Sequence, residues 1–278
     1  KKLSKQVGEM LILRGKAYGA TGLTQQGNQD LRKANSIIPD HPECVKFGVR
    51  AFLRAEKIYN MCLSKFKKGE NDEALKLILM AISLSGEDIK LHIMQARIHR
   101  TLEELEKAFQ AIQKATEMYQ SCSDFERRVP EEIVKETNMI YNDIALQCAG
   151  EGQYEKAILL LNKVIVTESQ LARNSQDIDY RFLLNRGDCH RAKKQYAQAL
   201  LDYNAAMTTL VSNKLGASSG LEGARRQWLI STRLSITNYL VACDYFNESA
   251  FADAEHHLTQ AIEQNPKVAE YYATRGKT

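Results

Sequence analysis

The sequence lacks the features of membrane-spanning chains and of disulfide-bonded secreted domains. No apolar run approaches the roughly 20 residues that a membrane-spanning helix needs, and the first residues do not form a signal peptide. The six cysteines never form a C-x-x-C pair, which argues against a zinc site and against a redox motif. We therefore expect reduced thiols, a cytoplasmic location and no association with a membrane.

The sequence also has few prolines, and neither sign of charge is in large excess. With four prolines and fifteen glycines, long disordered stretches are not expected. The net charge of +4 tolerates an acidic partner but does not indicate nucleic acid, so a nucleic-acid partner is not expected.

Catalytic and metal-binding patterns are missing as well. We find no nucleophile elbow, no paired carboxylates and no glycine-rich nucleotide loop, so we expect no catalytic residues, no cofactor and no enzyme activity. His256 and His257 are adjacent, and adjacent side chains on a helix point about 100° apart, which does not suit one metal ion. We expect both on an exposed helix face and no metal site.

What the sequence does contain is a repeated trio of small, large and small residues. Ala74, Ile78 and Ala81 recur 34 residues later. The copy 34 residues later is Ala108/Ile112/Ala115. Further copies of the trio are Gly27/Leu31/Ala34, Ala157/Leu161/Val164, Ala199/Tyr203/Ala206 and Ala254/Leu258/Ala261. A 34-residue period with helical spacing predicts an all-α solenoid of helix-turn-helix repeats.

A second small position accompanies the trio. If the first residue of each trio is repeat position 20, position 8 is small in every copy: Gly15, Cys62, Ala96, Ala145, Gly187 and Ala242. We expect positions 8 and 20 to face each other across a helix pair, because a bulky side chain there would force the helices apart. Gly69 and Gly152 are expected in the turn between two helices, and Pro39 and Pro266, at position 32, just after the second helix.

These positions define one solenoid over residues 1–278. Its predicted repeats are approximately 8–41, 55–88, 89–122, 138–171, 180–213 and 235–268, with a partial repeat from 269. Because a helix pair cut in its first helix cannot bury its own face, we expect the chain to be part of a longer repeat array.

Four insertions separate the predicted repeats, and two of them, 123–137 and 214–234, are candidate binding segments. In 123–137, Arg127 and Arg128 precede Pro130, which predicts a loop and then a first helix about two turns longer than standard. In 214–234, a flexible loop over Ser212–Gly223 is expected. Helix-forming residues resume at Leu221, and the candidate binding residues there are Arg225, Arg226 and Trp228.

The small positions 8, 20 and 27, the large position 24 and the prolines at position 32 together resemble the tetratricopeptide repeat over nearly the whole chain, although no copy has tryptophan at position 4. The resemblance implies a right-handed superhelix that binds proteins on a concave face, lined by positions 2, 5, 9 and 12 of each first helix. The candidate residues on this face are Lys90, Arg97, Arg100, Arg181, Arg191, Tyr59, Tyr239 and Phe246, with Ile93 and Leu184 at position 5. Such a lining suits a helix or extended peptide with apolar anchors and acidic residues, unless the arginines are merely solvated.

One family binding mode is not expected. The carboxylate clamp for chaperone C-termini uses Lys at position 5 and Asn at position 9 of one repeat, and no copy here has that combination.

Several strings resemble, in order, those of a tetratricopeptide-repeat protein of motile cilia and flagella. They include Tyr141–Ala145, Asn185–Cys189 and Ala261–Pro266. This resemblance implies a structural role in the axoneme, a location in the cytoskeleton and cilium, and axonemal or microtubule-associated partners, tubulin among them. Two alternatives stay open: a soluble adaptor that binds short peptides in its groove, and the substrate-recognition region of a larger enzyme.

Overall fold

The computed structural model describes residues 2–21, 24–121, 129–171, 178–212 and 221–278, which contain thirteen α-helices and no strand. The expected all-α fold is therefore confirmed for the described residues. These helices gather into two compact units, Lys1–Arg127 (unit 1) and Arg128–Thr278 (unit 2), each described by itself below. The single continuous solenoid over residues 1–278 stays a prediction.

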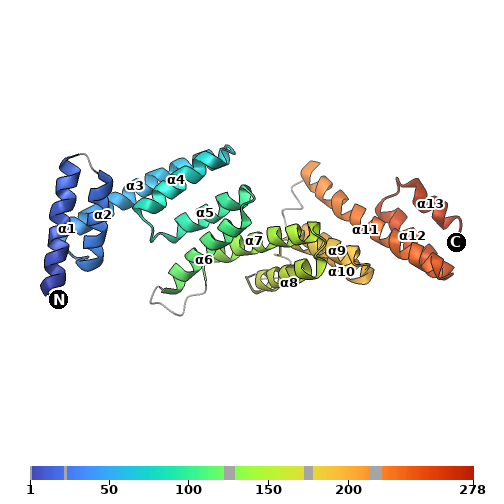
Figure 1. The fold of residues 1–278 in the computed structure, drawn as a ribbon. Helices are drawn as coiled ribbons and strands as arrows, with labels where there is room; N and C mark the ends of the chain where they lie inside the picture. Colours follow the sequence, from blue (N-terminus) through green and yellow to red (C-terminus); the bar gives the residue numbers. More distant parts are fainter. Residues whose placement is uncertain (1, 22–23, 122–128, 172–177, 213–220) are drawn as a thin grey trace. The chain divides into compact units, whose positions relative to one another are not determined.

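Both units are built from helix pairs in which each helix packs on the next one along the chain (Figure 1). The helices of unit 1 are α1 (Lys2–Ala20), α2 (Thr24–Ile37), α3 (Pro42–Lys67), α4 (Asn71–Leu84), α5 (Ile89–Thr101) and α6 (Leu105–Ser121). Those of unit 2 are α7 (Glu131–Gly150), α8 (Tyr154–Leu171), α9 (Tyr180–Ala192), α10 (Tyr196–Ser212), α11 (Leu221–Asn247), α12 (Phe251–Gln264) and α13 (Ala269–Arg275).

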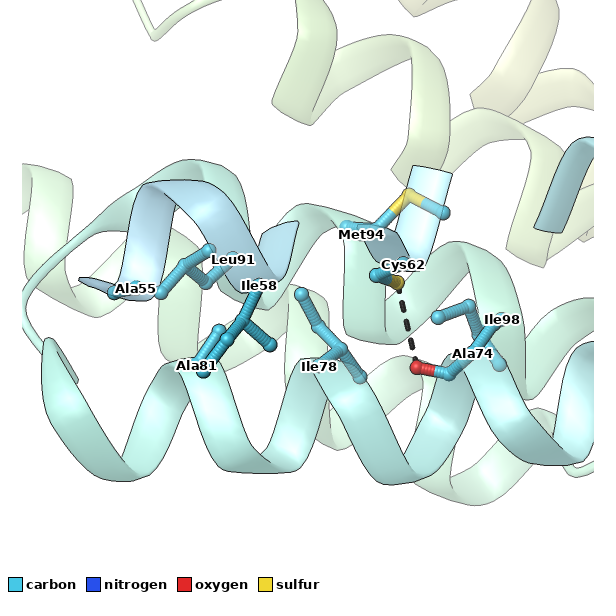
Figure 2. Close-up of a cluster of buried hydrophobic side chains, with 9 residues drawn as sticks. All are labelled: Ala55, Ile58, Cys62, Ala74, Ile78, Ala81, Leu91, Met94 and Ile98. Carbon is cyan, nitrogen blue, oxygen red and sulfur yellow. Dashed lines mark hydrogen bonds between the residues drawn. The ribbon is translucent and has the colours of Figure 1, made fainter. Parts of the chain in front are cut away.

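The small positions do face each other across the helix pairs. In the α3–α4 pair, the thiol of Cys62 donates a hydrogen bond to the carbonyl oxygen of Ala74, 3.3 Å away (Figure 2). In the α1–α2 pair, a Cβ atom on Gly15 would lie 3.0 Å from the carbonyl oxygen of Gly27. The helices approach so closely because neither position carries a bulky side chain.

The core of each unit consists of such pairs joined to the next helix. Around α3 and α4, the trio Ala74, Ile78 and Ala81 is fully buried, and Leu91 and Met94 of α5 complete the same cluster (Figure 2). Because the cluster is shared, each helix pair depends on its neighbour for part of its buried apolar surface.

The turns inside the pairs keep one backbone geometry at repeat position 15. Gly69 and Gly152 have φ values of +78°, which confirms them as turn glycines. Glu103, Lys194 and Ser249 take the same place in other pairs with φ values of 60°, 60° and 62°. Since a positive φ is costly for residues with a Cβ atom, the repeat imposes the turn even without glycine.

Four first helices are longer than the repeat requires, among them α1 with 19 residues. Helix α7 has 20 residues against 13 in α5, which confirms the predicted two extra turns, with Pro130 as the residue that precedes the helix. Helices α3 and α11 have 26 and 27 residues, so much of what interrupts the period is helical. The loop expected over Ser212–Gly223 ends too late, because α11 begins at Leu221 and Gly223 is buried inside it. Residues 213–220 lie outside the described residues.

The start of the seventh copy is helical as well. Helix α13 spans Ala269–Arg275 and buries Tyr271, whose ring lies 5.1 Å from that of Tyr239 on α11. None of the helices in the described ranges combines the length and the hydropathy that crossing a membrane requires.

Candidate functional site

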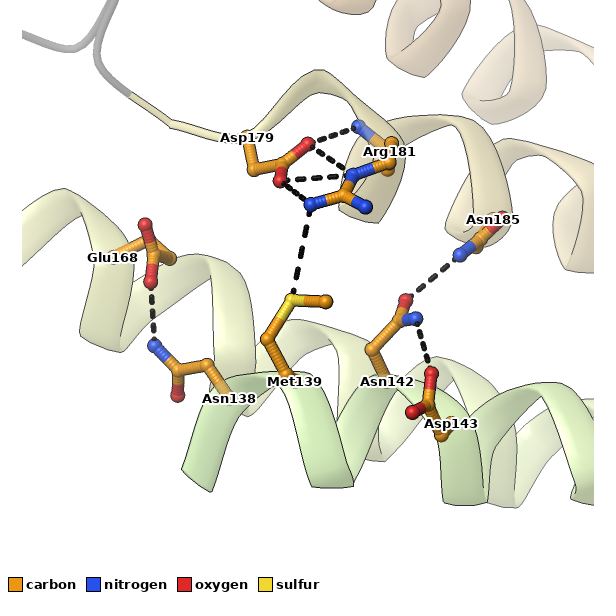
Figure 3. A network of polar contacts seen from close by, with 8 residues as sticks. All are labelled: Asn138, Met139, Asn142, Asp143, Glu168, Asp179, Arg181 and Asn185. Carbon is orange, nitrogen blue, oxygen red and sulfur yellow. Dashed lines mark hydrogen bonds and ion pairs between the residues drawn. The ribbon is translucent and has the colours of Figure 1, made fainter. Parts of the chain in front are cut away.

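Equivalent positions of neighbouring first helices lie side by side in unit 2. Arg181, at position 2 of α9, places its Nη2 atom 3.9 Å from the sulfur of Met139, at position 2 of α7 (Figure 3). The Arg181 guanidinium is exposed and is held by Asp179, whose Oδ2 accepts from Nε at 2.9 Å. This hydrogen bond raises the pKa of Arg181, so the side chain is a fixed cation.

In the third, fourth and fifth repeats the residue at position 5 is buried and does not line an open groove, contrary to what the sequence analysis expects. Ile93 and Leu184 are exposed by only 6% and 4%. Asn142, also at position 5, is buried and accepts a hydrogen bond of 2.7 Å from the side chain of Asn185 on α9 (Figure 3). The hydrogen bond between Asn185 and Asn142 joins α9 to α7, so this position connects neighbouring first helices within unit 2.

A cleft of about 530 Å³ opens in unit 2 and brings two candidate residues together. Arg181 from the expected groove and Arg226 from the 214–234 insertion both line it, with Lys135 and Met139 of α7. Each cation already has an acidic partner: Arg181 has Asp179, Arg226 has Glu222 at 3.2 Å, and Lys135 has Glu131 at 2.5 Å. The charges that line the cleft are therefore largely balanced, and Ile178, Phe182 and Leu210 add an apolar part to its wall.

Arg191 is half-buried and belongs to a polar connection between helices. Its Nη2 atom lies 3.1 Å from Oδ1 of Asp188, which also accepts a 2.7 Å hydrogen bond from the hydroxyl of Tyr203. Arg233 of α11 adds a two-pronged contact at 3.0 and 2.9 Å. Asp188 thus ties α9 to α10 and α11. The sequence analysis missed Arg233, because nothing in the repeat spacing relates it to Asp188.

Two candidate residues of unit 1, Lys90 and Tyr59, contact each other. Lys90 forms an ion pair with Glu56, and its ammonium lies 5.3 Å from the centre of the Tyr59 ring. Arg97 and Arg100 are half-buried on α5. Lys90 and Tyr59 therefore form one cation–aromatic pair that links α5 to α3.

The aromatic candidates at the end of unit 2 are half-buried. The hydroxyl of Tyr239 donates to Glu270 at 2.9 Å, and burial of the ring raises the pKa of Tyr239 to about 12. Phe246 packs edge-on against Phe251, with ring centres 5.4 Å apart. Both side chains join successive helices, so only part of each ring is available to a partner.

The first half of α11 presents an exposed face. Leu221, Trp228 and Leu229 are exposed by 91%, 61% and 38%, and Arg225 on the same side is exposed as well. The opposite side of this segment is packed, since Ile230 is fully buried against the core of α9 and α10. The insertion therefore supplies a helical surface with tryptophan, leucine and arginine, of which tryptophan and arginine are enriched among the residues that carry most binding energy at protein interfaces.

Two further expectations concern single residues. His256 is exposed as expected, but His257 is half-buried, because its ring stacks on Tyr245 and its Nδ1 lies 2.9 Å from the side-chain oxygen of Asn238. Across the described ranges no three His, Cys, Asp or Glu side chains gather as a metal site would require. Arg127 and Arg128 lie outside the described residues.

A family model matches one helix pair of the chain. The model described as "Tetratricopeptide repeat" covers residues 89–122, which contain α5 and α6. Other helix pairs of the chain resemble this repeat in their small facing positions.

The curated proteins that the chain resembles are named for the same repeat. The chain is 26% identical to human "Tetratricopeptide repeat protein 16" over 271 residues, which cover 97% of the chain and 28% of the relative. The mouse protein of the same name is 26% identical over 269 residues, covering 97% of the chain and 32% of the relative. The chain thus spans less than a third of the length of these relatives. Among solved structures, PilF of Pseudomonas aeruginosa is 14% identical with a TM-score of 0.41, and the match covers 99% of both chains.

Proposed function

We propose that the chain is a non-catalytic scaffold that docks other proteins as a structural component of the axoneme of motile cilia and flagella. The tetratricopeptide-repeat fold supports the scaffold role, because stacked helix pairs expose long surfaces and leave few enclosed cavities. The resemblance of its sequence strings to a repeat protein of cilia supports the location. Axonemal and microtubule-associated proteins, tubulin among them, are the proposed partners.

The observation that carries the scaffold proposal is the exposed face at the start of α11. Trp228 is the only tryptophan of the chain and is 61% exposed between the exposed Leu221 and Leu229. An apolar cluster of this kind on a well-packed helix is typical of an interaction site, because leaving it in water is unfavourable. Arg225 beside it favours a partner with an acidic residue next to an apolar pocket.

The proposal is tested by localisation and extraction. We expect the tagged protein to remain with purified axonemes after detergent and a mild salt wash. The double variant Leu221→Ala/Trp228→Ala should be released, and Leu201→Ala, at a 70% exposed leucine of α10, should be retained like the wild type. Absence of the wild-type protein from axonemes, or its loss in mild salt, would overturn the axonemal role. Co-sedimentation with purified microtubules tests tubulin as a direct partner.

A soluble adaptor that captures short peptides is the second candidate, and the cleft of unit 2 is the observation that favours it. A peptide with an acidic group could exchange with Asp179 for the exposed guanidinium of Arg181, while Met139 offers an apolar contact. Charge reversal at Arg181 should then abolish recovery of a peptide partner. Unchanged recovery from the variants Arg181→Glu and Arg97→Glu/Arg100→Glu counts against this candidate.

A further inference from the structure

The first half of α3 carries a face of large apolar side chains that no described part of the chain covers. Val45, Val49, Phe52 and Leu53 are exposed by 51%, 55%, 48% and 61%. Their spacing of four, three and one residues places them on one side of the helix. We call these four residues the α3 apolar face. They precede the second repeat, which begins near residue 55, so they lie outside the positions that line the concave face.

This helix segment is held firmly from its other side. Cys44 is fully buried against Ile12 of α1 and Ala34 of α2, and Ala51 is 8% exposed. Figure 1 shows this end of α3 beside α1 and α2. The α3 apolar face is therefore a preformed surface on a packed helix, and its exposure is not a sign of a loosely packed element.

A row of cations borders the α3 apolar face along one edge. Lys46, Arg50 and Arg54 each follow an apolar member of the face by one residue, and all three are exposed, as is Lys57 one turn further on. Lys46 lies 3.8 Å from Glu43. In the described part of the chain, Arg50, Arg54 and Lys57 have no ion-pair partner within 4.0 Å.

The other acidic residue of α3, Glu56, is already engaged. Glu56 pairs with Lys90 of α5, whose ammonium also lies 5.9 Å from the centre of the Phe52 ring. The α3 apolar face therefore ends where Lys90 reaches onto it, and the uncompensated charge along its edge is positive.

This charge pattern decides between the possible occupants. A second copy of the chain would bring one row of cations against another, which is unfavourable at close range. A helix that lies on an anionic bilayer carries its cations on a polar face exposed to water, whereas the side of α3 opposite the apolar face is packed on α1 and α2. A partner that carries both apolar and acidic side chains complements the apolar face and the positive charge along its edge.

We propose that the α3 apolar face binds an acidic amphipathic helix of another protein. Apolar side chains of that helix pack on Val49, Phe52 and Leu53, and its carboxylates pair with Arg50, Arg54 and Lys57. The proposal deepens the scaffold function proposed above by naming a second surface and the chemistry of its partner. It does not depend on the axonemal location.

The test uses a defined probe and the whole chain. A synthetic fluorescent peptide with leucine at the a and d positions of three heptads and glutamate beside them serves as the probe, and its anisotropy reports binding. We expect saturable binding that weakens as salt is raised. The variant Val49→Gln/Leu53→Gln should lower the affinity at least about tenfold. Arg50→Glu/Arg54→Glu should do the same and should instead bind a peptide with lysine in place of glutamate.

Matched controls separate the surface from general effects. Leu159→Gln/Leu201→Gln changes two leucines that are 69% and 70% exposed on α8 and α10, and Lys114→Glu reverses an exposed charge on α6. Both variants should bind the peptide like the wild type. Circular dichroism should show the same helix content in all variants, because every changed side chain is exposed.

Three outcomes overturn the proposal. They are no binding of the acidic peptide, equal binding by the Val49→Gln/Leu53→Gln variant, and binding to vesicles of phosphatidylcholine and phosphatidylserine through the same residues without peptide binding. Dimerisation through this face, seen as a concentration-dependent mass that the variants abolish, also contradicts it. Failure of the peptide test leaves the axonemal extraction result unaffected, so the two proposals fail separately.

Discussion

Gly187 and Tyr203 show how one repeat position limits the residue at another. A Cβ atom on Gly187 would lie 2.6 Å from Cε1 of the Tyr203 ring, which is closer than carbon atoms approach in folded proteins. Tyr203 is fully buried, and its hydroxyl donates to Asp188. Where position 24 is isoleucine or leucine, position 8 can hold alanine or cysteine. With tyrosine at position 24, only glycine fits without a shift.

We predict that Gly187→Ala destabilises the protein by about 1–3 kcal/mol, because the methyl group overpacks the ring. In a Tyr203→Leu background the same change should stabilise by up to about 1 kcal/mol, since alanine is the better helix former. Urea unfolding of the four proteins of this double-mutant cycle measures both values. A destabilisation that persists in the Tyr203→Leu background would contradict the steric explanation.

In three of the repeats a polar side chain at position 23 links the second helix of the pair to the first. In the first and fifth repeats, positions 7 and 23 form a two-pronged ion pair: Arg14 lies 2.6 Å from Asp30, and Arg186 lies 2.5 Å from Asp202. In the sixth repeat, position 23 is His257, which stacks on Tyr245 of α11. Burial and the nearby His256 lower the pKa of His257.

The pairing of α11 and α12 should therefore depend on pH. Because the pKa of His257 is lower in the folded protein than the value of about 6.5 in an unfolded chain, the unfolded state binds the proton more tightly. The stability that the neutral His257 side chain contributes is complete above about pH 6.5 and is lost as the pH falls below that value. Urea unfolding between pH 7.5 and 5.5 should show a stability decline in the wild type that is smaller in His257→Gln. Equal declines in both proteins would exclude His257 as the cause.

At the scale of the whole molecule, each unit contains buried clusters of its own. Unit 1 contains the clusters around Ile78 and Ala34, and unit 2 those around Tyr203, Leu161 and Leu258. In repeat proteins stability comes from each repeat and its immediate neighbours, so separate parts of an array commonly fold.

We predict that residues 1–127 and 128–278, produced separately, each remain helical and unfold cooperatively. Their far-UV circular dichroism spectra, weighted by length, should add up to the spectrum of the whole chain. If one part is unfolded alone and gains helix only when the other is added, its stability depends on contacts outside its own clusters.

Much of the fold could be predicted from the sequence, because the repeat has a strong local cause. The spacing of Ala74, Ile78 and Ala81 is set by close helix packing, and it identified the helix pairs and the facing small positions. The insertion that contains Pro130 predicted the longer α7. The candidate surfaces were harder to predict. Trp228 and Arg225 are exposed on α11, but Arg226 turns towards Glu222 and the cleft.

What the sequence by itself determined is the kind of molecule: an all-α chain of helix pairs in which small residues set the distance between helices. Only the tertiary structure decided which charges are available. Arg191 is engaged by Asp188, Lys90 by Glu56 and Arg181 by Asp179, whereas Arg50 and Arg54 stand beside an exposed apolar face. The reason is physical: a repeat period records packing within and between neighbouring helices, but an ion pair depends on where long side chains from different helices meet.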